Sequence, residues 1–96
     1  MSDLDPSIHQ PVRLQVMAAL TALPDDAQME FVALRKMLEL TDGNLSVHLR
    51  KLEQEGYVRV EKVFVGRKPR TFIAATPEGR KAFDDHVQAL KRIIGE

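Results

Sequence analysis

The chain has 96 residues, its 14 Lys and Arg are balanced by 14 Asp and Glu, and it contains no cysteine. This length is typical of one small domain, and the missing thiols exclude disulfides, thiolate metal sites and cysteine nucleophiles. The acidic N-terminus has no basic region ahead of an apolar run, and no apolar segment approaches the roughly 18 residues of a membrane helix. We therefore expect one soluble, cytoplasmic domain over residues 1–96.

The zero net charge conceals an uneven distribution. Residues 1–43 contain three Lys or Arg against seven Asp or Glu, residues 44–70 contain seven against three, and residues 71–96 contain four of each. The net charges are therefore −4, +4 and 0, and a local excess can create a local field even when the total is zero. The middle segment is a candidate surface for a polyanion, and chance clustering of solvated charges is the alternative.

The first part of the chain has the pattern of two or three short helices. Asp5 and Pro6 are typical of an N-cap and a first helical position, and Pro11 can begin the next helix. Apolar residues within 12–23 recur at i, i+4, i+7, i+8 and i+11, which predicts an amphipathic helix. From Met29 the same period resumes and predicts a further helix of about two turns.

A third patterned helix follows the segment "ELTDGN", which predicts a tight turn containing glycine. Thr41 or Asp42 is the expected N-cap, and Gly56 the expected C-terminal glycine. The core-facing stripe consists of Leu45, Leu49 and Leu52.

Beyond Gly56 the period changes to that of strands. The runs "YVRVEKVFV" and "TFIAA" are rich in β-branched and aromatic residues, and "GRKP" lies between them, which predicts a hairpin with Gly66 in the turn and Pro69 outside the ladder. "TPEG" then predicts a last helix capped by Thr76. The order helix, helix, helix, hairpin, helix is that of a mainly α winged helix-turn-helix.

The outward face of the third helix is a candidate DNA-reading surface. With the leucine stripe on the core, the helical period turns a polar, cationic face outward. Short side chains near the helix start suit base edges, and the cations suit bases or phosphates. A polar outer face is also what any surface helix shows. The candidate residues on this helix are Asn44, Ser46, Val47, Arg50, Lys51 and Gln54.

The hairpin tip adds a second cationic element. Arg67, Lys68 and Arg70 lie where no core contact explains them, and Pro69 stiffens the tip. Such a turn beside a recognition helix can straddle the DNA backbone and place an arginine in the minor groove. A charged turn that serves only solubility is the alternative.

The segments "HQPVRLQVMAAL", "LELTDGNLSVHLRKLEQEGYVRVEKVFVGRKPRT" and "TPEGRKAF" together resemble the compact winged-helix transcriptional regulators related to the MarR and ArsR groups. The resemblance covers roughly residues 6–90. It implies a homodimer, a recognition helix at residues 42–55 and a wing at 64–72. It also implies that Ser46, His48 and Arg50 occupy positions that commonly contact DNA. The chain lacks the cysteines of many metal-sensing relatives and the extra helices of longer MarR proteins, and a small-molecule effector stays an open alternative.

The histidines and acidic residues do not predict an enzyme or a metal site. No two histidines are spaced at i+3 or i+4, and "DDH" at 84–86 diverges around its helix, which favours a solvated helix edge. For His48, 60° from the leucine stripe, a packing or capping role is favoured over base reading. We expect no catalytic residue, no metal and no cofactor.

The terminal helices, at about 5–23 and 77–94, are predicted to contribute to a dimer. The last helix repeats apolar residues at coiled-coil spacing, so it packs either on its own first helix or on a second subunit. A twofold dimer would place two recognition helices roughly 34 Å apart. The predicted interface residues are Leu4, Ile8, Phe83, Val87, Leu90 and Ile94.

The sequence thus predicts a transcriptional regulator that binds double-stranded DNA as a homodimer and acts by operator occupancy. The alternative is a winged helix used only for protein–protein contact. An interface of that kind normally contains aromatic anchors, and the outward face of residues 44–54 has none.

Overall fold

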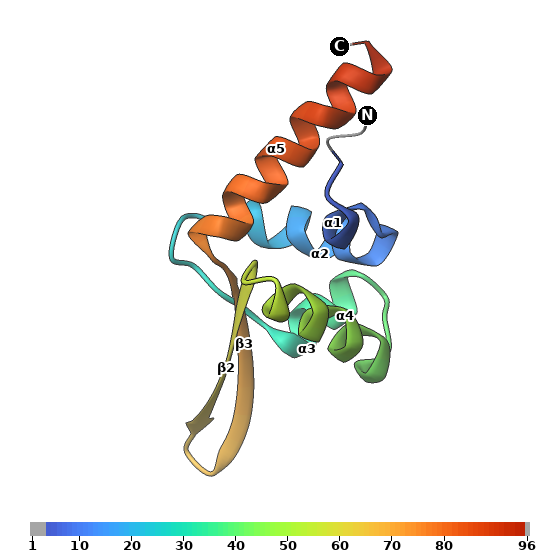
Figure 1. The fold of residues 1–96 in the computed structure, drawn as a ribbon. Coiled ribbons are helices and arrows are strands. Elements are labelled where there is room, and N and C mark those ends of the chain that lie inside the picture. Colours follow the sequence, from blue (N-terminus) through green and yellow to red (C-terminus); the bar gives the residue numbers. More distant parts are fainter. Residues whose placement is uncertain (1–3, 96) are drawn as a thin grey trace.

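Residues 4–95, which the computed structural model describes, form five helices and three strands (Figure 1). The predicted order helix, helix, helix, hairpin, helix is confirmed by α2, α3, α4, the pair β2 and β3, and α5, and the short helix α1 and the strand β1 add to it. The elements are α1 (Pro6–His9), α2 (Pro11–Thr21), β1 (Met29–Glu30), α3 (Phe31–Met37), α4 (Asp42–Gln54), β2 (Val58–Val65), β3 (Lys68–Ala75) and α5 (Pro77–Ile94).

Three helices begin at the predicted N-caps. The side chain of Asp5 accepts a hydrogen bond from the Ser7 amide at the start of α1. Thr41 accepts from the Asn44 amide at the start of α4, and Thr76 caps α5 in the same way. Each cap satisfies a backbone donor that the helix itself leaves unpaired, which stabilises a helix by about 1 kcal/mol.

The turn between α3 and α4 differs from the prediction. Because Thr41 is the cap, α4 already begins at Asp42, and Gly43 lies in its first turn rather than in the connection. The reversal is made instead at Glu39, whose φ of 55° is left-handed. The following amide, of Leu40, donates to the carbonyl of Arg35 at 3.0 Å.

The sheet has the order β1-β3-β2 and is antiparallel throughout. Strand β1 was predicted as the start of a helix, and that prediction is wrong. Met29 pairs with Ile73 and Glu30 with Phe72. A two-residue strand has no period of its own, and it forms because β3 offers it a free edge.

The hairpin loop is shorter than predicted. Val65 pairs with Lys68, so only Gly66 and Arg67 form the loop, and Gly66 takes a φ of 67°. Pro69 lies inside β3 opposite Phe64, not outside the ladder. It is tolerated because β1 reaches only as far as Phe72, so no third strand needs a hydrogen bond from position 69.

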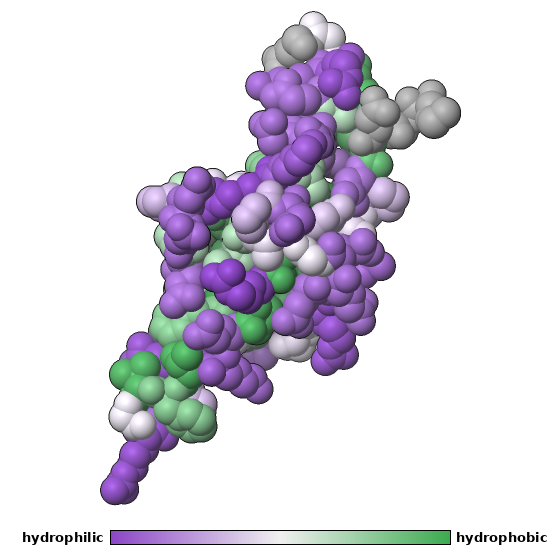
Figure 2. All heavy atoms as spheres, turned by 60° about the vertical axis from the view of Figure 1, so that its left-hand side comes forward, coloured by the Kyte–Doolittle hydropathy of each residue, from purple (hydrophilic) through white to green (hydrophobic). Residues whose placement is uncertain are grey.

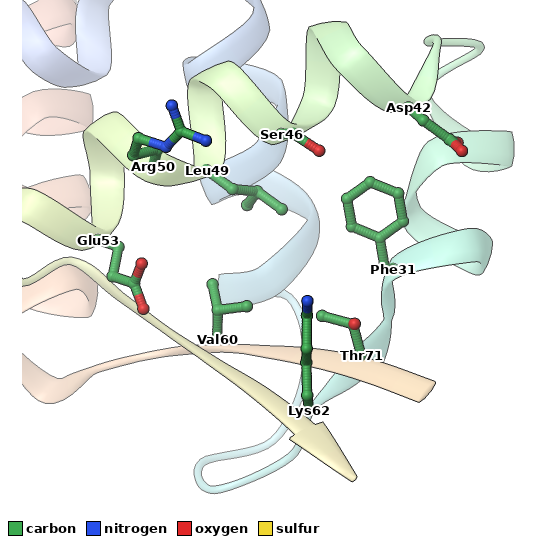
Figure 3. A pocket seen from close by; sticks show the side chains of 9 residues that line it. All are labelled: Phe31, Asp42, Ser46, Leu49, Arg50, Glu53, Val60, Lys62 and Thr71. Atoms are coloured by element: carbon green, nitrogen blue, oxygen red, sulfur yellow. The ribbon is translucent and has the colours of Figure 1, made fainter. Parts of the chain in front are cut away.

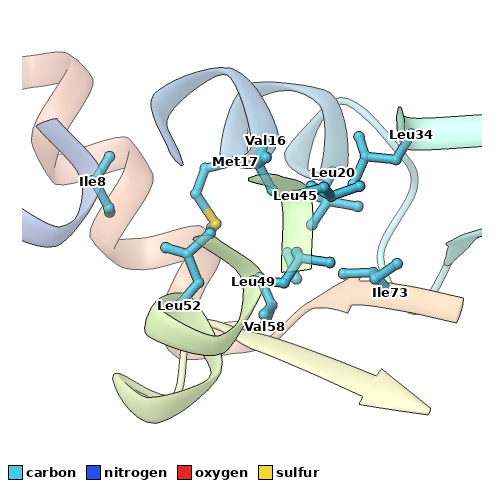
Figure 4. Close-up of a cluster of buried hydrophobic side chains, with 11 residues drawn as sticks. Ile8, Val16, Met17, Leu20, Leu34, Leu45, Leu49, Leu52, Val58 and Ile73 are labelled. Atoms are coloured by element: carbon cyan, nitrogen blue, oxygen red, sulfur yellow. The ribbon is translucent and has the colours of Figure 1, made fainter. Parts of the chain in front are cut away.

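The core lies between α2, α3, α4 and the sheet (Figure 4). The wing formed by β2 and β3 and the helix α5 extend from it in opposite directions (Figure 1), which gives the chain extents of 51 × 25 × 22 Å. Completely buried side chains come from helices and sheet alike. They include Ile8, Val16, Met17, Leu20, Leu34, Leu45, Leu52 and Ile73.

Helix α5 does not bury the stripe that its spacing predicts. Its buried residues are Gly79, His86 and Ala89, whereas the predicted stripe is half-buried at Phe83, Val87 and Leu90 and exposed at Ile94. The stripe therefore lies beside the face of α5 that is buried. The small side chains of Gly79 and Ala89 on the buried face allow α5 to approach the rest of the chain closely.

Gly79 shows how close this approach is. A Cβ at position 79 would lie 2.0 Å from the carbonyl oxygen of Tyr57. No side chain larger than hydrogen fits between α5 and the segment that leads into β2.

Candidate nucleic-acid interface

Helix α4 buries Leu45, Leu49 and Leu52 and exposes its opposite side, as the leucine stripe predicts. Val47 has 61% of its surface exposed and makes no part of the core. Gly43 lies on the same outer side, where a Cβ would meet nothing within 4 Å. The other exposed candidates are Asn44, Ser46, Arg50, Lys51 and Gln54, and His48 is half-buried.

A cavity of about 410 Å³ separates α4 from the wing (Figure 3). Ser46 and Arg50 reach it from α4, and Lys62 and Thr71 reach it from the sheet. It therefore joins two of the candidate residues of the helix, Ser46 and Arg50, to the sheet in one concave surface. Its remaining lining residues are Phe31, Asp42, Leu49, Glu53 and Val60.

Lys62 was not singled out from the sequence. Strand alternation places Val58, Val60 and Lys62 on one face of β2. Val58 is buried in the core beneath α4, and Lys62 therefore faces α4 (Figure 3). The period of two in this strand would have been enough to find it.

His48 contacts α2 rather than solvent. Its Nδ1 lies 3.2 Å from Nη1 of Arg13, and Nε of Arg13 donates to the carbonyl of Ser7. Arginine can only donate, so Nδ1 of His48 accepts and is unprotonated. Burial and the nearby Arg13 charge lower the pKa of His48 below its ordinary value. Arg13 thus connects α1, α2 and α4, which the sequence did not indicate.

The cations differ in how far they are already paired. Lys51 lies 3.3 Å from the carboxylate of Glu55, and Asp42 at the start of α4 lies 2.8 Å from Arg35. Within residues 4–95, Arg50 forms no ion pair within 4.0 Å, and we call such a cation uncompensated, although Glu53 lines the same cavity.

The wing shows the same division. Arg70 is paired with Glu30 of β1 at 3.1 Å, which holds it against the side of the sheet. Arg67 and Lys68 are exposed at the tip, and among the described residues no carboxylate forms an ion pair with either. The tip therefore has two uncompensated positive charges.

The fold brings together two histidines that are 77 residues apart. Nδ1 of His9 lies 3.4 Å from Nε2 of His86, and the amide of Asp5 donates to Nδ1 of His86 at 3.2 Å. His86 is 1% exposed, so the prediction of a solvated edge is wrong for it, although Asp84 and Asp85 are exposed. Its burial, and then the neighbouring His9, lower its pKa.

Neither a metal centre nor a membrane span emerges from the described residues. From Leu4 to Gly95, no three His, Cys, Asp or Glu side chains are grouped so that they could hold a metal ion. In that same part of the chain, no helix has the length and apolar character needed to cross a membrane.

A pair of helices joined by a tight turn, supported by α2 and followed by a hairpin, defines a winged helix-turn-helix. In this arrangement α4 occupies the position of the recognition helix, and β2 with β3 forms the wing. The chain belongs to the winged helix DNA-binding domain family, whose sequence model matches residues 12–94. The predicted fold and family resemblance are thereby confirmed.

Similar proteins support the same assignment. An uncharacterised protein of Methanocaldococcus jannaschii is 37% identical over 82 residues, which span 85% of this chain and 86% of that protein. The structure of a transcriptional regulator homologue from Pyrococcus horikoshii has a TM-score of 0.85 and 35% identity, covering 93% of this chain and 85% of that one. A structure from Enterococcus faecalis assigned to the MarR family of transcriptional regulators has a TM-score of 0.72 and 27% identity, covering 93% and 76%. Fold and family are those of DNA-binding transcriptional regulators.

Proposed function

We propose that this protein regulates transcription by occupying an operator in duplex DNA as a homodimer, with α4 in the major groove. One observation supports this most strongly. The uncompensated cations lie on one continuous surface, because Arg50 and Lys62 line the same cavity and Lys62 is on the strand that leads to Arg67 and the wing tip.

Helix α4 and the wing would make different contacts with DNA. The front of α4, with Asn44, Ser46 and Val47, approaches base edges, and Val47 can contact a thymine methyl group. Arg50, Lys51 and Gln54 reach bases or phosphates further along the helix. His48, already held by Arg13, fixes the position of α4 instead of reading bases.

The wing supplies contacts that depend little on sequence. Arg67 and Lys68 at the tip meet the phosphate backbone or the minor groove. Arg70 adds positive charge at the side of the sheet, and its ion pair with Glu30 reduces the charge that it offers to DNA.

The dimer would form through the terminal helices. Ile93 and Ile94 at the end of α5 are 62% and 66% exposed, and the half-buried Phe83, Val87 and Leu90 continue that apolar surface. Leu4 is half-buried at the other terminus. Ile8 is fully buried in the chain's own core, so the proposed interface does not include it.

The proposal is tested by fluorescence anisotropy of a labelled mixed-sequence duplex at several salt concentrations. We expect dissociation constants of about 10⁻⁴–10⁻⁶ M near physiological salt. The logarithm of the dissociation constant should change linearly with the logarithm of the salt concentration. Lys91→Ala on α5 removes a cation far from the wing and is the matched control. Absence of binding even at low salt would contradict DNA binding and favour a protein partner for the same surface.

A further inference from the structure

Phe64 is the most exposed of the large apolar side chains in residues 4–95, at 74%. It lies on β2 directly opposite Pro69, and the pair of Val65 with Lys68 separates it from the hairpin loop. Figure 2 shows apolar atoms gathered on the wing between the body of the molecule and its hydrophilic tip. Phe64 is not among the residues of the core or packed against it, so the folded chain does not explain it.

The orientation of Phe64 follows from its strand. Val58, Val60, Lys62 and Phe64 alternate with the residues of the opposite face. The first two pack beneath α4 and Lys62 lines the cavity beside α4, so Phe64 continues the face that is turned toward the recognition helix. Cross-strand pairing puts the ring of Pro69 on that same face.

The charges around Phe64 indicate what it meets. Residues 62–71 contain four cations and no carboxylate. A partner for this segment must therefore be polyanionic and also offer apolar surface at close range. Duplex DNA does both, because the base stack and the sugars lie between two rows of phosphates.

We propose that Phe64 is an apolar wedge that the wing inserts into the minor groove at a base step, while Lys62 and Arg67 contact the flanking phosphates. The inference rests on the proposed function and adds a specificity-determining residue to it. Apolar side chains from minor-groove proteins unstack base steps in this way. Pyrimidine–purine steps such as TA unstack most easily, so the wing selects flexible steps without reading base edges.

Pro69 and the short loop make the wedge effective. A two-residue loop and a proline directly across the strand restrict how the tip can move, which lowers the ordering cost when the ring is inserted. The neighbouring Val65, 53% exposed, lies on the opposite face of β2 and provides a matched control.

The test compares two duplexes of the same base composition, one of alternating d(TA) steps and one of oligo(dA) paired with oligo(dT). In each duplex some adenines are replaced by 2-aminopurine. The fluorescence of 2-aminopurine rises when the base is unstacked. For the wild-type chain we expect a rise on the alternating duplex. Phe64→Ala should lose that rise. Its affinity for the alternating duplex, divided by its affinity for the stiff A-tract, should be roughly tenfold lower than for the wild type.

Three further results make the outcome specific. Phe64→Ala should leave the salt dependence unchanged because no charge is removed. Phe64→Leu should keep most of the fluorescence rise, and Val65→Ala all of it. If Phe64→Ala matches the wild type in ratio and fluorescence, or if Val65→Ala causes the same loss, the wedge is overturned while DNA binding stands.

Failure of the proposed function would look different. A wild-type chain that binds neither duplex at low salt contradicts DNA binding itself. Sedimentation of the free protein tests whether a second copy of the chain, instead of DNA, covers Phe64. If Phe64→Ala dissociates an oligomer, Phe64 contacts a second copy of the chain, and the wedge is overturned.

Discussion

Nη1 of Arg13 lies 3.2 Å from Nδ1 of His48, so a side chain near the start of α2 contacts the middle of α4. The same guanidinium donates to the carbonyl of Ser7 in α1. Arg13 therefore adds polar contacts between α1, α2 and α4 to the packing of the leucine core.

Replacement of Arg13 by alanine should loosen this connection. Both contacts are lost, and a hydrogen bond of a charged group contributes about 1.5–3 kcal/mol to the free energy of unfolding. The pKa of His48 should rise, since the Arg13 charge that helps to lower it is gone. Denaturant unfolding and NMR titration of the His48 ring measure the two effects. An unchanged His48 titration would contradict the contact.

The buried histidines make stability depend on pH in a defined direction. His86 and His48 have pKa values below 6.5 in the folded chain, so near and below pH 6.5 the unfolded chain binds more protons. The free energy of unfolding should therefore fall as the pH is lowered from about 7.5 to about 5.5. His86→Asn, whose side-chain oxygen can still accept from the Asp5 amide, should flatten the dependence. A wild-type stability that rises on acidification would contradict this assignment.

Tyr57 provides a second, independent titration at high pH. Its hydroxyl donates to the carboxylate of Asp5, and this hydrogen bond, burial and the negative charge of Asp5 raise its pKa from 10.0 to about 12. The contribution is present below pH 10 and is lost as the pH rises toward about 12. Because Tyr57 is the only tyrosine and there is no tryptophan, phenolate absorbance reports it alone. In Asp5→Asn the titration should move back toward 10; no movement would contradict the pair.

Two glycine-to-alanine substitutions should have opposite effects on stability. In helix interiors alanine is favoured over glycine by about 1 kcal/mol, and Gly43→Ala in the first turn of α4 should gain less than that, because its Cβ meets open space. Gly79→Ala places a methyl group 2.0 Å from the Tyr57 carbonyl and should lower the free energy of unfolding by about 2 kcal/mol or more. Thermal unfolding of both variants checks this. A stabilised Gly79→Ala would mean that α5 does not approach Tyr57 so closely.

On DNA, Arg50→Ala and Lys68→Ala should differ in kind. Lys68→Ala should weaken binding to all sequences alike and reduce the salt slope by about one, because the contact proposed for Lys68 is with a phosphate. Arg50→Ala should lose about 1–3 kcal/mol of preference for a selected operator. Anisotropy titrations with operator and mixed-sequence duplexes, with Lys91→Ala as control, distinguish the two. Unchanged affinity and slope for Lys68→Ala would show that the wing assignment is wrong.

The sequence by itself determined the features that depend on neighbours along the chain. The caps at Asp5, Thr41 and Thr76 form within three residues, the leucine stripe of α4 follows from helical period, and the cationic hairpin tip follows from composition. These local rules were sufficient for the order of the longer helices and the hairpin, though not for β1, and for most of the candidate DNA surface.

Only the tertiary structure decided which distant segments meet. The pairing of β1 with β3, of Arg13 with His48, and of His9 with His86 joins residues separated by 35 or more positions. The pairing of Arg70 with Glu30 likewise decides which wing cations stay uncompensated. No local period encodes such contacts, because they depend on how the packed core orients each element. The same packing buries His86 and Gly79 of α5, although the apolar spacing of that helix indicated another face.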